Sequence, residues 1–199
     1  ALPILPSPFV MTDMEVAATR IVAVARPPGQ SAVTTTSPRA RPESRPRGET
    51  FVTRKVTRGI ARILAGLDKK IYLGNLEARR DWGYAGDYVE GMWLMLQADK
   101  PQDYVLATGN SLSVREFCNL VFKEVGLDLK WSGSGTEEIA KDQHSRVVIR
   151  IDDKYFRPTE VPFLMGDATK AYTELGWEPK IRIDELIQNM VNVELSLKT

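Results

Sequence analysis

The stretch DWGYAGDYVEGMWLMLQADKPQDYVLATG, residues 81–109, contains the two patterns that decide the fold. After a short strand and a turn, its apolar residues recur at helical spacing, with Asp87 as the predicted N-cap. DYVLATG (103–109) then has the apolar and β-branched composition of a strand. The stretch therefore predicts a helix followed by a strand, and the helix is expected to bury Val89, Met92, Trp93 and Leu96.

The same alternation continues downstream. Ser113 and Glu116 form a capping-box pattern that predicts the start of a helix over 114–126. LDLKW and RVVIRID are predicted strands, separated by the glycine-bearing loop SGSGTEE. DATKAYTELGW and IDELIQNMVNVELSL are predicted to close the chain as two amphipathic helices.

Upstream, TFVTRKVTRGIARILAGL (50–67) predicts a helix with Thr50 as N-cap and Gly66 as terminator. One face of this helix carries Val52, Val56, Ile60, Ile63, Leu64 and Leu67. The strand KIYLG follows it. Because strands alternate with helices from residue 71 onward, the sequence predicts an α/β fold with at least part of a parallel sheet. The alternations are too few for a complete dinucleotide-binding domain together with a substrate domain.

The first 50 residues differ in composition from the rest. They hold eight of the 12 prolines and no Lys, Tyr or Trp. Such a segment buries too little apolar area to offset its ordering entropy. We therefore expect an irregular or aberrant, disordered leader over 1–46, with a possible short strand within 17–25, and one folded part over 47–199. A transit peptide is an alternative, because residues 16–42 contain no acid. The Ala at position 1 also suggests a fragment.

Charge and composition exclude several classes of function. With 27 basic and 26 acidic residues, a nucleic-acid or membrane-surface partner is not expected. Cys118 and His144 are the single Cys and His, so no disulfide, zinc site or Ser-His-Asp triad is expected, and a cytoplasmic location is favoured. No run approaches the ~18–20 apolar residues of a membrane span.

No motif for catalysis stands out. The sequence lacks G-x-G-x-x-G, a P-loop and any Tyr-x-x-x-Lys pair, so we assign no catalytic and no metal-binding residue. Cations instead lie beside predicted strand ends and turns. Arg forks suit diphosphates and carboxylates, which indicates anion binding, whereas solvated surface charge or structural ion pairing is the alternative. These cations are Arg47, Arg54, Lys55, Arg79, Arg80 and Arg157.

Several segments closely resemble the GDP-mannose 4,6-dehydratases, which are extended short-chain dehydrogenase/reductases. They are FVTRKVTRGIARI, YLGN, RRDWGYAGDYVEGMWLMLQ, YVLATG, SVREF, YFRPTEV, GDATKA and LGWEPK, and the resemblance runs from about residue 43 to the C-terminus. It implies the end of a Rossmann-like fold with a C-terminal α/β substrate-binding domain. It also implies NADP as cofactor, GDP-mannose as substrate and assembly into a homo-oligomer. The family's upstream half, with its Gly-rich turn and its catalytic Thr, Glu, Tyr and Lys, has no counterpart here.

The resemblance also implies roles for individual residues. Arg47 would touch NADP, Lys55 and Arg80 would reach the nucleotide diphosphate, and Val52 would pack near the base. The guanosine would be lined by Leu73, Gly74 and Asn75, and the nucleoside held by Arg157 and Glu160. Asp81 and Asp87 are expected to orient backbone rather than ligand, and the four tryptophans to lie in the core or an interface.

Two classes of function follow. The chain resembles the C-terminal part of a lyase that makes GDP-4-keto-6-deoxymannose for GDP-fucose synthesis. Alternatively it is a non-catalytic GDP-sugar-binding or assembly module, or a sibling nucleotide-sugar epimerase or reductase. Because it lacks a catalytic centre, we expect little turnover from the 199-residue chain alone, and poor solubility where its sheet edge and apolar face are uncovered.

Overall fold

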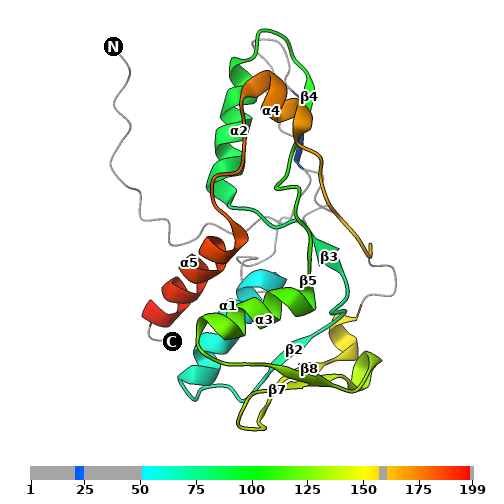
Figure 1. Cartoon of the computed structure of the whole chain (residues 1–199), viewed down its shortest axis with the longest axis vertical. Coiled ribbons are helices and arrows are strands. Elements are labelled where there is room, and N and C mark those ends of the chain that lie inside the picture. The colour runs from blue at the N-terminus through cyan, green and yellow to red at the C-terminus, as the bar shows by residue number, and fades with distance from the viewer. Residues whose placement is uncertain (1–20, 25–50, 157–160, 198–199) are drawn as a thin grey trace, which may run out of the picture.

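Two apolar cores, one at each end of the molecule, organise the chain (Figure 1). The computed structural model describes the backbone of residues 21–24, and residues 51–156 and 161–197 with their side chains. We call the two ends the large part and the small part. The α/β class predicted from the sequence is confirmed.

The large part has helices packed over one face of a four-stranded sheet (Figure 1). The helices are α1 (Val52–Leu64), α3 (Val114–Glu124) and α5 (Ile183–Ser196). The sheet has the order β2-β8-β7-β6, with β2 (Ile71–Leu73), β6 (Lys130–Ser132), β7 (Ile139–Lys141) and β8 (Val147–Ile151). The β2–β8 pair is parallel, whereas β7 is antiparallel to both its neighbours, so the sheet is mixed. Short 3-10 turns, η2 (Gly135–Glu137) and η3 (Asp153–Tyr155), lie at its edge.

The small part contains α2 (Ala85–Gln97), β4 (Asp103–Leu106) and α4 (Thr169–Leu175). Its β4 pairs antiparallel with β1 (Ile21–Val24), which confirms the strand predicted within 17–25. The other residues of the predicted 1–46 leader lie outside the described residues. Between the two parts, β3 (Arg79–Arg80) pairs with β5 (Leu112–Ser113). Among the described residues, no helix is both long and apolar enough to cross a membrane.

The local signals for helix ends are confirmed in part. Ser113 and Glu116 form the predicted capping box, with Glu116 N donating to Ser113 Oγ at 3.1 Å and Ser113 N to Glu116 Oε2 at 2.7 Å. Gly66 has φ 74° just beyond α1, which is the left-handed conformation of a helix terminator. However, Phe51 rather than Thr50 occupies the N-cap position of α1.

The predicted burial of α2 is wrong for three of its four residues. Val89 is 54% exposed, Trp93 60% and Leu96 57%, and we call these three residues the α2 apolar face. The helix buries a neighbouring face instead, with Tyr88, Gly91 and Met95. A Cβ at Gly91 would lie 2.6 Å from Leu106 Cδ1 and 2.8 Å from Trp177 Nε1. The missing side chain therefore lets this face approach β4 closely, and that approach sets which residues are buried.

Candidate functional site

Lys55 projects from the first turn of α1 toward the η3 turn that follows β8. Its Nζ lies 3.2 Å from the centroid of the Tyr155 ring, which is a cation–π contact. Burial lowers the pKa of Lys55, Asp152 opposes this shift, and Lys154 adds to it. The described residues offer the ammonium no hydrogen bond and no ion pair. Its N–H donors are therefore available to an anion.

The η3 turn that carries Tyr155 is fixed against the end of β2. Asp152 N donates to Leu73 O at 2.9 Å, and Tyr155 N donates to Asp152 O at 2.9 Å. A Cβ at Gly74 would overlap the Tyr155 carbonyl oxygen, so glycine is needed there. Since β2 and β8 are parallel, their carboxyl ends meet at one edge, which is where α/β sheets bind ligands.

The other residues predicted for this edge differ in which of their groups are available to a ligand. Leu73 is buried in the core, so its backbone alone faces the edge. Val52 is half-buried and packs against the same core. Asn75 Oδ1 accepts from Glu77 N at 2.9 Å, which leaves its Nδ2 without a partner among the described residues. The Asn75 amide is therefore the side-chain donor beside Gly74.

Arg80 is placed differently from Lys55. Its Nη1 donates to Arg79 O and to Val161 O, each at 2.7 Å, and so ties β3 to the segment that follows residue 160. Arg79 is turned the other way, donating from Nη2 to Ser111 O at 2.6 Å and pairing with Glu116 at 3.1 Å. Of these two arginines, Arg80 is therefore the one directed at Val161.

The predicted residues Arg47, Arg157 and Glu160 lie outside the described residues. Tyr155, which touches Lys55, and Val161, which accepts from Arg80, flank residues 157–160. Six residue steps span at most about 20 Å. Lys55 and Arg80, which are 25 residues apart in sequence, therefore contact residues only six apart from each other.

The residues expected to be structural hold backbone in place. The Asp81 carboxylate accepts from Thr108 N at 3.0 Å, Thr108 Oγ1 at 2.6 Å and Gly109 N at 3.0 Å. Asp87 is the third residue of α2 rather than its N-cap, and accepts from the amides of Lys180 and Ile181 at 3.0 and 3.1 Å. The prediction that these two aspartates orient backbone is confirmed.

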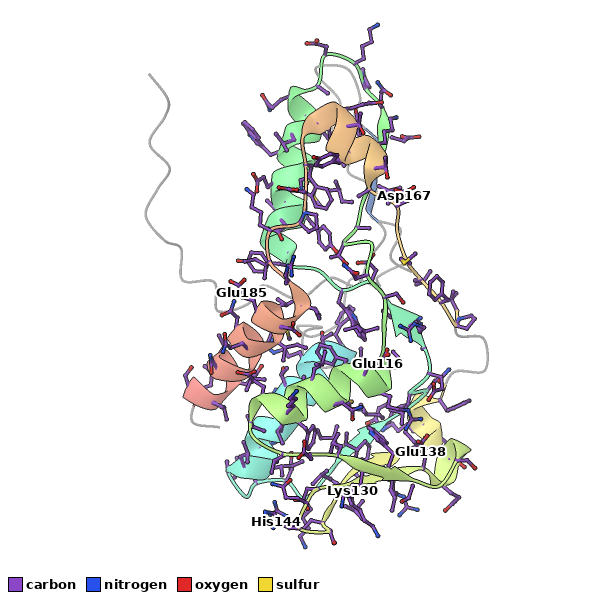
Figure 2. All side chains as sticks on the ribbon, viewed as in Figure 1. Glu116, Lys130, Glu138, His144, Asp167 and Glu185 are labelled. Carbon is purple, nitrogen blue, oxygen red and sulfur yellow. The ribbon has the colours of Figure 1, made fainter. Side chains whose placement is uncertain are left out.

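The single His and the single Cys lie away from this edge. His144 is exposed at the outer end of the turn between β7 and β8, as Figure 2 shows. Cys118 is fully buried, and burial raises the pKa of its thiol to about 12. Trp82 and Trp177 are buried as predicted, whereas Trp93 is exposed. No cluster of three or more His, Cys, Asp or Glu that could hold a metal occurs in the described part of the chain.

Sequence reasoning missed Tyr155 and Asp152 as site residues. Tyr155 is in the quoted segment YFRPTEV, but its partner Lys55 is 100 residues away. The close approach of Gly74 to the Tyr155 carbonyl links the end of β2 to the Tyr155 segment, and no local spacing signals such a contact.

Comparisons with known proteins identify the family of the chain. The family model described as GDP-mannose 4,6 dehydratase matches residues 30–190. The chain belongs to the GDP-mannose 4,6-dehydratase family. Among relatives of this dehydratase family, GDP-mannose 4,6 dehydratase 2 of Caenorhabditis elegans is 53% identical over 155 residues, covering 78% of this chain and 41% of that protein. The human GDP-mannose 4,6 dehydratase is 48% identical over 156 residues, covering 78% and 42%.

Solved structures support the fold of this dehydratase-family chain. RMD from Pseudomonas aeruginosa, complexed with NADPH, superposes with a TM-score of 0.60 at 19% identity, covering 76% of this chain and 45% of that one. The dTDP-glucose 4,6-dehydratase of Bacillus anthracis, in complex with NAD, gives 0.54 at 18% identity, covering 73% and 39%. The chain spans about two fifths of the length of the curated relatives it matches.

The cofactor of such neighbours does not fit the residues described here. A dinucleotide pyrophosphate is held by a glycine-rich turn at a helix N-terminus, and the sequence has no G-x-G-x-x-G. At Gly74, Gly83 and Gly91, an added Cβ would meet protein atoms instead, so these glycines pack against the protein. The described donors at the β2–β8 edge therefore do not form a dinucleotide cradle.

Proposed function

We propose that this chain is the nucleotide-sugar-binding part of a GDP-mannose 4,6-dehydratase and that it takes the GDP portion of GDP-mannose. The Lys55 ammonium carries the proposal, because it lies at the carboxyl edge of β2 and β8 with no hydrogen-bonding partner among the described residues. A diphosphate supplies the anionic oxygens that such an ammonium binds. Family membership supports the nucleotide-sugar class.

Each site residue has a role in this proposal. Lys55 and Arg80 face the diphosphate, and Arg157 joins them at the nucleoside. Glu160 accepts from the two guanine N–H groups, which a carboxylate can pair with and which adenine does not offer. The guanosine side is formed by Val52 near the base, the backbone of Leu73 and Gly74, and the Asn75 amide.

The reaction belongs to the longer family protein in this proposal. GDP-mannose loses water to give GDP-4-keto-6-deoxymannose for GDP-fucose synthesis, which is a lyase reaction with NADP as cofactor. Arg47 is the one residue here assigned to NADP. The proposal also includes a homo-oligomer and a cytoplasmic location for that longer form. Since this sequence has no Tyr-x-x-x-Lys pair, the chain binds and orients the substrate and does not itself move protons.

For the 199 residues alone, a GDP-sugar-binding fragment without turnover is the second candidate. The absence of a Tyr-x-x-x-Lys pair from the sequence favours it. A sibling epimerase or reductase has less support, because relatives near 50% identity carry the dehydratase name.

Calorimetric titration of the 199-residue chain with GDP, GDP-mannose and ADP tests the proposal. We expect both guanine nucleotides to bind and ADP to bind more weakly. Lys55→Gln removes a charge-assisted hydrogen bond, so GDP affinity falls about tenfold or more. Lys70→Gln is the matched control, since Lys70 lies 5.7 Å from the Tyr72 ring just before β2. Equal binding of GDP and ADP, or equal effects of the two lysine variants, contradicts the proposal.

A further inference from the structure

The Tyr155 side chain occupies an unusual place for an aromatic residue at the surface. The residue is 42% exposed, yet one face of its ring is covered by the Lys55 ammonium at 3.2 Å from the centroid. Cations within about 6 Å of a ring centroid are attracted to its negative face. Lys154 lies farther from the same ring, at 5.8 Å. Lys55 is therefore the cation that the ring holds.

The backbone under the ring is anchored independently of Lys55. Asp152 caps η3 by accepting from Lys154 N at 2.9 Å, and its own amide donates to Leu73 O at 2.9 Å. The Tyr155 carbonyl lies directly against Gly74. The ring thus projects from a turn fixed to β2, while the lysine projects from α1. The contact joins two rigid elements rather than two flexible loops.

A lysine at a binding site carries an entropic penalty that this contact reduces. Its four-carbon stem loses rotamer freedom when it is immobilised. The ring restricts the stem before any ligand arrives and removes part of the hydration of the ammonium. The lowered pKa of Lys55, caused first by burial, agrees with partial dehydration, although Asp152 raises it and Lys154 lowers it further. A ring face cannot satisfy all three N–H donors, so donors remain for an anion.

We propose that Tyr155 is a positioning residue that holds the Lys55 ammonium ready for the nucleotide diphosphate. The proposal rests on the proposed function, because the anion it serves is the diphosphate of GDP. This proposal adds Tyr155 to the site, and the atoms of Tyr155 need not touch the ligand. The aromatic ring, and not the phenolic hydroxyl, does the positioning.

Two measurements on the 199-residue chain test the positioning role of Tyr155. In the first, NMR of ¹³C-lysine-labelled protein follows the Lys55 methylene protons, which a ring face shifts upfield. We expect the shift in the parent chain and in Tyr155→Phe, and its loss in Tyr155→Leu. Tyr72→Leu is the matched control, because Tyr72 is similarly exposed and its nearest lysine, Lys70, lies 5.7 Å from the ring.

In the second, GDP titration should show Tyr155→Leu binding about two- to fivefold more weakly than the parent, with Tyr155→Phe and Tyr72→Leu unchanged. Tyr155→Met replaces the leucine variant if thermal melting shows that variant to be unfolded. An unshifted Lys55 signal in the parent, or undiminished GDP binding in the ringless variants, overturns the positioning role alone. A parent chain that binds no GDP overturns the proposed function and this proposal with it.

Discussion

The α-carbon of Gly74 lies against the carbonyl oxygen of Tyr155, with no room for a side chain between β2 and η3. This contact joins segments 81 residues apart and sets the distance from the end of β2 to the ring that holds Lys55.

Gly74→Ala is therefore expected to displace η3 and to lower GDP affinity about two- to fivefold, because the Lys55 ammonium then loses its partner ring. Gly126→Ala is the control. Gly126 has φ 74° and open space around its Cα, so its replacement costs about 1–2 kcal/mol of backbone strain far from the site. Thermal melting and GDP titration of both variants separate the two effects. A Gly74→Ala chain that binds GDP like the parent contradicts the assignment of this edge.

Glu160→Gln is expected to weaken GDP binding by about tenfold or more and to leave ADP binding unchanged. The neutral amide accepts less strongly than a carboxylate and presents its own N–H to the guanine donors. Glu178→Gln, on the exposed loop before α5, is the control. Calorimetry with both nucleotides measures the ratio, and a parallel loss for GDP and ADP counts against guanine recognition by Glu160.

Arg54 and Glu194 link α1 to α5, with Nε 3.1 Å from Oε1 and the Glu194 side chain 7% exposed. Arg54→Met leaves a nearly buried carboxylate without its partner, so we expect about 3 kcal/mol of lost stability in urea unfolding. The double variant with Glu194→Met should recover most of this loss, since two apolar side chains need no partner. If the double variant is as unstable as the single one, the loss comes from packing rather than from charge.

The stability of α3 is expected to depend on pH through Glu116. The backbone hydrogen bond from Ser113 lowers the pKa of this carboxyl, burial opposes the shift, and the Arg79 charge lowers it further. Because the folded-state pKa lies below the ordinary value of about 4.3, the contribution is complete above that value. It disappears as the pH falls through the lower folded-state pKa.

Glu116→Gln should remove this pH dependence and about 0.5–1 kcal/mol of stability at neutral pH. Glu124→Gln, at the other end of α3, should leave both unchanged. Urea unfolding at a series of pH values between about 3 and 7 measures the effect. Identical pH profiles of stability for the parent and Glu116→Gln would contradict this prediction.

The α2 apolar face is expected to drive self-association of the isolated chain, since Val89, Trp93 and Leu96 form one exposed stripe. Trp93→Gln should lower the weight-average mass in sedimentation experiments at a given concentration. Leu197→Gln changes an exposed leucine outside the stripe and serves as the control. A parent chain that stays monomeric and melts cooperatively removes the basis for this expectation.

Features encoded within a few residues could be predicted from the sequence, whereas long-range contacts could not. The capping box of Ser113 and Glu116 needs only a three-residue spacing, and both of its hydrogen bonds form. The buried face of α2 was misassigned because apolar residues occur on more than one face of that helix. Its orientation depends on Trp177, which packs against Gly91 from 86 residues away.

The candidate site shows the same difference between local motifs and long-range contacts. Lys55, Gly74 and Arg80 were predicted through motifs that resemble the family, and Lys55 and Gly74 both contact Tyr155 of η3. Tyr155 and Asp152 were missed because their part in the site comes from contacts with α1 and β2, not from their neighbours in sequence.

The Asp81 carboxylate has a consequence for how the chain folds. Besides Thr108 and Gly109, it accepts from Gly166 N at 3.4 Å, so one side chain joins three segments separated by up to 85 residues. Contacts between residues so far apart in sequence form slowly, because the long loops between them must close before the contacts can stabilise the chain. We therefore expect the junction between the two parts to form late in folding. Its opening should expose the amides of Thr108 and Gly109 to hydrogen exchange together, as one cooperative unit.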